Sequence, residues 1–447
     1  MTKDKTFYKQ FFSLYWVLVL HNIIVFGVNL ADNIMIGSYS ETALAGVAAV
    51  NQIQFIFQQI IMGCGEGLVV LGSQYWGQGR TDEIKRISFG AMIIGVIAGS
   101  LLFVSAAAVP ERIISIFSPT PDIIIQGAEY LRIIKYTYIV FAITNILLAT
   151  LRTVETVKIG FYISVSTLII NCSINYLLIH GNFGFPELGV AGAAIGTLTA
   201  RVVELIAVIC YIAFSDKKLR ISLKDYFCFD KGIFKDYFRI GRTIVIVNGM
   251  FGVSTALQSV ILGHMSDSAI AANSVSTSLY QMLKVAAVGA ASATSVIIGK
   301  TIGTGDMKKL KDYTKTFQLM FVMIGAVIAV SLFILRAPVL SMYNLTPETM
   351  ELANMFLLIM CAAGFGMSYQ MPVLCGIVRG GGDPGFVLKN DFISIWLIVL
   401  PISFLAAFKF NLHPAIVVFC LNADQIFKCG AAFFKVNSYT WVKKLTK

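Results

Sequence analysis

The sequence predicts an all-α polytopic membrane protein with twelve transmembrane helices in two pseudo-symmetric six-helix lobes. Hydrophobic residues make up 57% of the 447 residues and charged residues 13%, whereas a soluble domain carries about 25% charged residues. Apolar runs of about 20 residues recur from end to end, and each can cross a hydrocarbon core of about 30 Å as a helix. The same short patterns also occur twice, half a chain apart. Together these observations predict tandem membrane-embedded repeats.

The internal repeat is clearest where the second span of each half begins. "SETALAGVAAVNQ" starts at Ser40, and "SDSAIAANSVSTS" starts about 226 residues later, at Ser266. Each is followed at the same distance by a glycine pair and a charged stretch. Many secondary transporters are built from such repeats, with the binding site between or inside the halves. We predict an N-lobe over residues 1–214, a basic cytoplasmic linker over 215–236 and a C-lobe over 237–447.

Six spans are predicted in each lobe, with ends accurate to a few residues. Those of the N-lobe are Phe11–Gly37, Ala43–Tyr75, Ile87–Val109, Ile123–Leu151, Ile159–Ile179 and Val190–Phe214. Those of the C-lobe are Phe238–Leu262, Ala269–Ile302, Thr316–Leu335, Leu352–Ile377, Phe386–Phe408 and Ala415–Phe434.

Basic residues gather in every second loop and at both ends of the chain, as at Lys3, Lys5, Lys443 and Lys444. Because cytoplasmic loops carry an excess of Lys and Arg, both termini and the linker are predicted to be cytoplasmic. These loops account for the net charge of +11, so no nucleic acid partner is expected. We predict an integral protein of the plasma (inner) membrane that functions as a monomer within the lipid bilayer.

Several stretches resemble the multidrug and toxic compound extrusion (MATE) family over nearly the whole chain. They include "ADNIMIGSYSETALAGVAAV", "GSQYWGQGRTDEIKR", "LRTVETVK", "VRGGGDP" and "NCSINYLLIHGNFGFPELGVAGAAIGT". The resemblance implies two six-helix lobes around a central cavity. It also implies a secondary active antiporter that exports amphipathic, cationic organic compounds in exchange for H⁺ or Na⁺, without a cofactor.

The first span carries one acidic residue in a polar stripe that the second copy repeats without a charge. Asn22, Asn29 and Asp32 share one helical face. The equivalent positions in the seventh span are Asn248, Thr255 and Gln258. An ionisable residue inside a membrane span is costly, so Asp32 is a candidate for ion coupling. Alternatively, Asp32 lies near the outer end of the span and only caps a helix.

Polar residues of the fifth and sixth spans extend this candidate site. Asn171 and Asn175 are four residues apart, and so lie on one helical face. By resemblance, the family's first-lobe cation site falls on Asp32, Asn171, Asn175 and Thr197. One carboxylate suits a proton, and oxygen ligands suit Na⁺; no other metal is expected. Alternatively, the two asparagines only join neighbouring helices.

Other polar residues of the spans are candidates for the substrate cavity. Glu66 stands where the second copy has Ser292, and lies near the helical face of Gln54 and Gln58. It could supply a second carboxylate, attract a cationic substrate, or be a protonated acid bonded to backbone. Lys284 is the counterpart of Gln58, and we expect either a role in substrate binding or ion coupling, or structural pairing. The candidates are Asn29, Gln54, Gln58, Glu66, Gln258 and Lys284.

Two further charged pairs are interpreted as structural. Arg201 and Glu204 are three residues apart in the sixth span, and Asp424 and Lys428 are four apart in the twelfth. At these spacings each pair can neutralise itself on its own helix.

The second lobe lacks acids where the NorM-like branch of the family has them, since Phe251 and Ser368 stand near those positions. The resemblance is therefore to DinF-like members, with coupling in the first lobe. A flippase for a lipid-linked substrate of the same superfamily is the alternative, although twelve spans and few cavity-placed arginines argue against it. The sequence has no P-loop and no H-E-x-x-H or G-x-S-x-G motif, so we expect neither an ATP-driven pump nor an enzyme.

Overall fold

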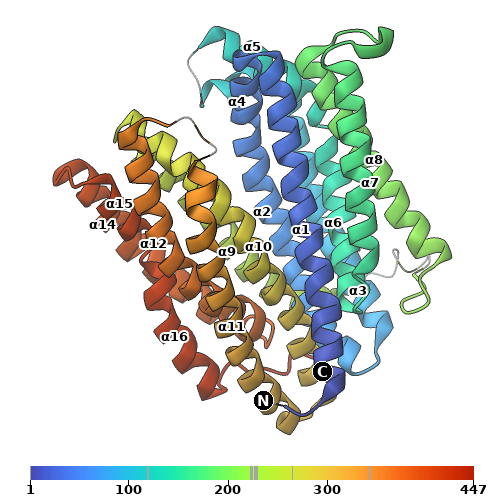
Figure 1. The fold of residues 1–447 in the computed structure, drawn as a ribbon. Helices are drawn as coiled ribbons and strands as arrows, with labels where there is room; N and C mark the ends of the chain where they lie inside the picture. Colours follow the sequence, from blue (N-terminus) through green and yellow to red (C-terminus); the bar gives the residue numbers. More distant parts are fainter. Residues whose placement is uncertain are drawn as a thin grey trace. The chain divides into compact units, whose positions relative to one another are not determined.

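The computed structural model describes residues 2–117, 120–221, 225, 230–263, 265–341, 343 and 345–446. Every regular element among these residues is a helix, and Figure 1 shows that most of them are long. Eleven helices are long and apolar enough to cross a membrane, and the count reaches twelve when one bent pair is taken as a single span. The predicted all-α fold with twelve spans is confirmed.

The first half of the chain contains the first six spans. Its helices are α1 (Lys5–Tyr39), α2 (Glu41–Gly77), α3 (Thr81–Ala108), α4 (Pro110–Ser115), α5 (Pro121–Ile134), α6 (Thr137–Thr153), α7 (Lys158–Leu178), η1 (Asn182–Gly184) and α8 (Gly189–Phe214). The fourth span is the bent pair, because α5 and α6 meet at 52°. At the bend, the Thr137 hydroxyl donates a 2.6 Å hydrogen bond to the Ile134 carbonyl. Such side-chain hydrogen bonds compete with the helical ladder and bend helices.

The second half contains the other six spans. Its helices are α9 (Lys231–Gly263), α10 (Asp267–Thr304), α11 (Met307–Leu340), α12 (Pro347–Met371), η3 (Pro372–Val378), α13 (Pro384–Asp391), η4 (Phe392–Val399), α14 (Leu400–Phe404), η5 (Leu405–Lys409), α15 (Pro414–Asn422) and α16 (Asp424–Ser438). The π-helical segments η3, η4 and η5 interrupt the tenth and eleventh spans near Pro372 and Pro401. Proline lacks the backbone N–H that a regular α-helix needs.

The chain forms two compact units. The N-unit contains Leu20–Gly72 and Gly79–Asn248, and the C-unit contains Met1–Val19, Ser73–Gln78 and Gly249–Lys447. The units follow the two halves of the repeat, with three exceptions: the start of α1 and the end of α2 belong to the C-unit, and the start of α9 belongs to the N-unit. Residues 222–224 and 226–229 of the predicted linker lie outside the described residues. The lobe boundaries at residues 214 and 237 remain a prediction.

Glycines bring α7 and α8 close together in the N-unit. A Cβ atom at Gly192 would lie 2.6 Å from the Leu178 carbonyl oxygen, and one at Gly196 would collide with Asn175 Oδ1. Small residues at helix interfaces permit this close approach in membranes. As a consequence, the polar face of α7 lies directly against the turn of α8 that carries Thr197.

The C-terminal segment packs inside the C-unit. Trp441 is fully buried, and its indole N–H donates to the Val436 carbonyl at 2.8 Å. The Gln74 side chain bonds the backbone of Lys443 and of Leu445, and a Cβ atom at Gly381 would collide with the Trp441 ring. The glycine run that precedes Asp383 therefore makes room for a buried tryptophan. Figure 1 shows both chain ends at the same end of this unit.

Candidate functional site

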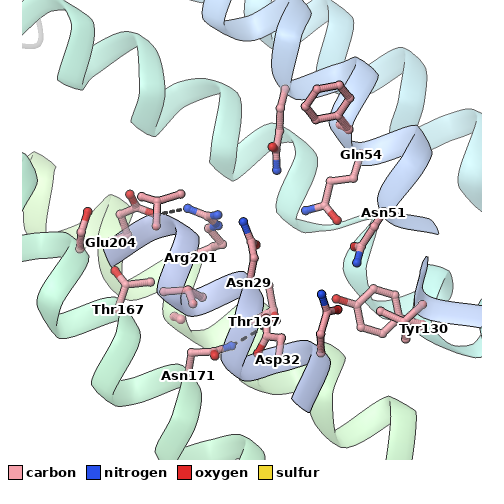
Figure 2. Close-up of a pocket in the computed structure, with 18 residues that line it drawn as sticks. Asn29, Asp32, Asn51, Gln54, Tyr130, Thr167, Asn171, Thr197, Arg201 and Glu204 are labelled. Atoms are coloured by element: carbon pink, nitrogen blue, oxygen red, sulfur yellow. Dashed lines mark hydrogen bonds and ion pairs between the residues drawn. The ribbon is translucent and has the colours of Figure 1, made fainter. Parts of the chain in front are cut away.

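The N-unit contains a polar pocket of about 260 Å³ among its helices. Side chains from α1, α2, α5, α7 and α8 line it, and Figure 2 shows them pointing into a common space. Apolar side chains such as Val25, Val28 and Phe55 share this lining with amides, hydroxyls and charged groups. The pocket therefore offers apolar surface together with a few converging polar groups, which is typical of small-molecule sites.

The four residues predicted for ion coupling form one hydrogen-bonded chain. Asn175 Nδ2 donates to Asp32 Oδ1 at 2.6 Å and to Asn171 Oδ1 at 3.4 Å. Asn171 Nδ2 in turn donates to Thr197 Oγ1 at 3.3 Å. The two asparagines are buried, whereas Asp32 and Thr197 are half-buried and line the pocket. The chain thus connects α1, α7 and α8.

The ligands available to a cation here are oxygen atoms. Among the described residues, the buried Asn175 Oδ1 has no hydrogen-bond partner. No group of three or more His, Cys, Asp or Glu side chains in the described part of the chain is arranged to hold a metal. Carboxylate, amide and hydroxyl oxygens suit a small hard cation such as Na⁺, and the same carboxylate can accept a proton. The residues fit either ion.

Three of the predicted cavity residues line this pocket. They are Asn29 on α1, and Gln54 and Gln58 on α2. Figure 2 places Asn29 and Gln54 around the same space as Asp32. The face of α2 that carries Gln54 and Gln58 therefore meets this pocket.

Glu66 does not line this pocket, and a role at a substrate cavity remains a prediction for it. Its carboxylate forms an ion pair with Arg152 at 2.6 Å, and only 9% of its side chain is exposed. Arg152 lies at the end of α6, 86 residues further along the chain. A contact at that separation depends on how α2 and α6 pack, so sequence spacing gives no signal for it.

Gln258 and Lys284 belong to the C-unit and are likewise absent from the pocket lining. The Lys284 ammonium lies 5.3 Å from the centre of the Phe251 ring. A cation over an aromatic face is stabilised by the ring quadrupole. The structure therefore gives Lys284 an aromatic neighbour within its own unit.

Both charged pairs predicted on single helices are present. Arg201 and Glu204 are joined at 2.8 Å, and Lys428 and Asp424 at 3.0 Å. Two features were missed. Lys428 also binds Asp391 at 2.8 Å, and Arg201 and Glu204 line the pocket near Asp32. The i, i+3 spacing identified the Arg201–Glu204 pair, but it did not show that the pair faces the pocket.

Comparisons with known proteins agree over almost the full chain. The MatE family model matches residues 18–177 and 244–405. A probable multidrug resistance protein NorM from Thermotoga maritima is 22% identical over 431 residues, which is 95% of this chain and 90% of the relative. A NorM of the same description from Listeria innocua is 26% identical over 91% of this chain and 89% of the relative.

Solved structures share the fold. A transporter of the MOP superfamily from Pyrococcus furiosus, described as having a binding pocket of reverse polarity, superposes with a TM-score of 0.87 at 16% identity, covering 98% of this chain and 97% of that chain. The bent form of the Vibrio cholerae MATE transporter VcmN superposes with a TM-score of 0.84 at 17% identity, covering 96% of each chain.

Proposed function

Because this chain belongs to the MatE family, whose members are transporters and not enzymes, we propose that it is a multidrug efflux antiporter of the plasma membrane. It exports amphipathic, cationic organic compounds in exchange for H⁺ or Na⁺, acts as a monomer and has both termini in the cytoplasm. The observation that carries this proposal is the hydrogen-bonded chain from Asp32 to Thr197 at a polar pocket. The basic loops support the orientation.

Asp32 is the residue at which ion and substrate compete. Its hydrogen-bond partner Asn175 is neutral, so a proton, Na⁺ or a substrate cation can each neutralise the carboxylate. Occupation by the ion weakens the attraction for the substrate cation, and the reverse holds equally. Exchange follows when the two conformations of the transporter differ in their affinity for ion and substrate.

Coupling is proposed in the first lobe, as in DinF-like members, although the relatives named above are NorM proteins. Two features support this choice. Neutral residues stand at Phe251 and Ser368 in the second half. Gln258 also occupies the position that matches Asp32 in the repeat. The second half therefore lacks the carboxylates that a NorM-like site would require at those positions.

The experiment is efflux from proteoliposomes under separately imposed H⁺ and Na⁺ gradients, with a panel of cationic dyes. Asp32→Asn keeps the size of the side chain and removes its charge, so we expect gradient-driven efflux to fall at least about tenfold. Asp122→Asn, which removes an exposed carboxylate at the start of α5, is the matched control and should transport normally. Unchanged efflux by a folded Asp32→Asn protein would refute the proposal. Translocation of lipid-linked substrates without dye efflux would favour the flippase.

A further inference from the structure

The C-unit contains an apolar groove among three of its spans, α11, α12 and α16. Its volume is about 630 Å³, which lies within the range of small-molecule sites. The residues that line it are aliphatic, aromatic, Gly or Cys. Because exposed apolar side chains are expected on any surface that meets lipid, only the concave shape of this surface calls for an explanation.

Small residues form the floor of the groove and large ones form its walls. A Cβ atom at Gly366 would collide with the Gln425 carbonyl oxygen, so the backbones of α12 and α16 close the floor. The Cys429 thiol donates to the Gly366 carbonyl at 3.3 Å, which satisfies both groups inside the floor. The walls are exposed side chains: Val330, Phe333, Phe365 and Ile426. The groove is thus an apolar slot that opens toward the lipid.

A guanidinium group lies at one end of the groove. Arg336 is one turn beyond Phe333 on α11, and its guanidinium carbon is 4.0 Å from the centre of the Phe333 ring. Arg336 also interacts electrostatically with Cys361, which lines the groove from α12. The lining residues of α11 begin about 5 Å from Arg336 along the helix axis and end about 10 Å from it. The groove therefore has an apolar length and a cationic end.

The part of the chain that the structure describes gives this guanidinium no anionic partner. Its Nη1 is covered by protein atoms and has no hydrogen-bond partner among the described residues. The ion pairs of those residues do not include Arg336. A charged side chain at the edge of a membrane span is costly unless it is paired or reaches the interface. A lipid phosphate is an anion that the bilayer supplies at that level.

The proposed orientation places Arg336 at the outer headgroup level. α11 begins beside the basic residues Lys308, Lys309 and Lys311, which are assigned to the cytoplasmic side. The span predicted from hydropathy ends at Leu335, one residue before Arg336. The groove therefore extends from the headgroups into the outer half of the hydrocarbon core, which is about 15 Å thick.

We propose that this groove binds one anionic phospholipid of the outer leaflet, with its phosphate on Arg336 and an acyl chain along the slot. The planar guanidinium binds two phosphate oxygens through parallel N–H groups. A zwitterionic lipid carries an ammonium that competes with Arg336 for the phosphate, so a lipid of net negative charge, such as phosphatidylglycerol, binds more tightly. This site goes beyond the efflux function, because it belongs to the C-unit, whereas the pocket at Asp32 belongs to the N-unit.

Lipid affinity of the purified protein tests the role of Arg336. Native mass spectrometry, with titration of palmitoyl-oleoyl phosphatidylglycerol or the matching phosphatidylcholine, measures the dissociation constant of the first bound lipid. We expect wild-type protein to prefer phosphatidylglycerol severalfold. Arg336→Gln should weaken binding of phosphatidylglycerol at least about tenfold, because charge-assisted hydrogen bonds are lost.

Two further variants control for charge and geometry. Arg112→Gln removes an exposed guanidinium on α4 and should bind the lipid as wild type does. Arg336→Lys keeps the charge but loses the planar fork, so its affinity should be intermediate. Equal affinities of wild type and Arg336→Gln, or equal losses in Arg336→Gln and Arg112→Gln, would overturn the proposal.

Cross-linking tests where the acyl chain lies. In bilayers that contain phosphatidylglycerol with a diazirine on one acyl chain, we expect cross-links to concentrate on the peptides that carry Phe333, Cys361 and Phe365. Ala362→Phe fills the groove from an exposed position and should abolish these cross-links. Ala107→Phe, at an exposed position of α3, is the matched control and should keep them.

Other occupants of the groove give different results. Cross-links spread evenly over the exposed faces of all spans would show only bulk lipid around the protein, and would overturn the proposal. A dimer that Ala362→Phe dissociates would assign the groove to a second copy of the chain, and would also overturn it.

Thermal unfolding separates loss of the lipid from loss of the fold. A ligand that binds only the folded protein raises its Tm, so phosphatidylglycerol should raise the Tm of wild type and Arg112→Gln more than that of Arg336→Gln. If Arg336→Gln does not fold, Arg336→Lys and Ala362→Phe carry the same test, and wild-type affinity in both would refute the proposal. Neither lipid affinity nor cross-linking depends on an ion gradient, so failure of the antiporter proposal would leave this test intact.

Discussion

Two regions of the molecule, one around Asp32 and one around Lys428, treat buried charge in opposite ways. In the N-unit, Asp32 has a neutral amide as its hydrogen-bond partner and faces a cavity. In the C-unit, Asp424 and Lys428 are each 3% exposed, and Lys428 binds two carboxylates. Removing charges from water is costly unless they are paired. The comparison teaches that a buried acid alone does not indicate a coupling site. A buried acid without a counter-ion does, whereas a buried acid paired with a cation belongs to a structural network.

The largest expected effect comes from moving the acid between the two halves. Asp32→Asn combined with Gln258→Asp restores the number of carboxylates at the repeated positions, but not the neighbours Asn171, Asn175 and Thr197. We expect gradient-driven efflux to remain at least about tenfold below wild type in proteoliposomes. Recovery of efflux would show that a carboxylate in either half supports coupling. That result would contradict the difference that we infer between the two regions.

Breaking the buried ion pairs of Lys428 with Asp391 and Asp424 should lower the stability of the protein. The molecules that remain folded should still transport substrate. Lys428→Met leaves Asp391 and Asp424 without their cation, and removing one member of a buried ion pair costs about 3–5 kcal/mol. Thermal unfolding of the purified protein measures this loss. The triple variant with Asp391→Asn and Asp424→Asn as well is the control, and it should recover most of the stability. A single variant as stable as wild type would contradict the interpretation.

Steric pressure on the Asp32 chain should impair transport more than it impairs folding. Gly196→Ala places a Cβ atom against Asn175 Oδ1, and overpacking of this kind costs about 1–3 kcal/mol. Because Asn175 is the partner of Asp32, we expect efflux per folded molecule to fall severalfold. Gly249→Ala is the matched control on α9, since nothing lies within 4 Å of its added Cβ atom. Equal efflux by the two variants would argue that the Asn175 contact is dispensable.

The smallest effect concerns a loop outside the spans. Burial raises the pKa of the Asp383 carboxyl, but hydrogen bonds from Lys435 and Lys443 outweigh burial and hold the pKa below its ordinary value. A lowered pKa stabilises the fold above the unfolded-state value of about 3.9, and that stabilisation is lost as pH falls through the folded-state pKa.

Asp383→Asn should therefore cost about 1 kcal/mol near neutral pH. The gap between wild type and variant should close as the pH drops below about 4. Thermal unfolding measured across pH checks both the size of this stability difference and the direction in which it changes with pH. A gap that widens on acidification would show that the lysines do not stabilise the charged form.

Much of the candidate site followed from the sequence, but by two different routes. Spacing alone placed Asn171 and Asn175 on one face, and comparison of the repeats identified Asp32. Their meeting with Thr197 followed from the family resemblance. The ion pair between Glu66 and Arg152 and the bond between Lys428 and Asp391 had no local signal, because they join residues on different helices.

The sequence by itself determined the twelve spans, the duplication and the single acid in the polar stripe of the first span, because hydropathy, length and repetition are properties of a continuous stretch of chain. Only the tertiary structure decided that span four bends near Thr137, that Glu66 turns to Arg152 and that Arg201 faces the pocket. Those outcomes depend on the rotation and packing of each helix against its neighbours, which side-chain contacts between distant residues set.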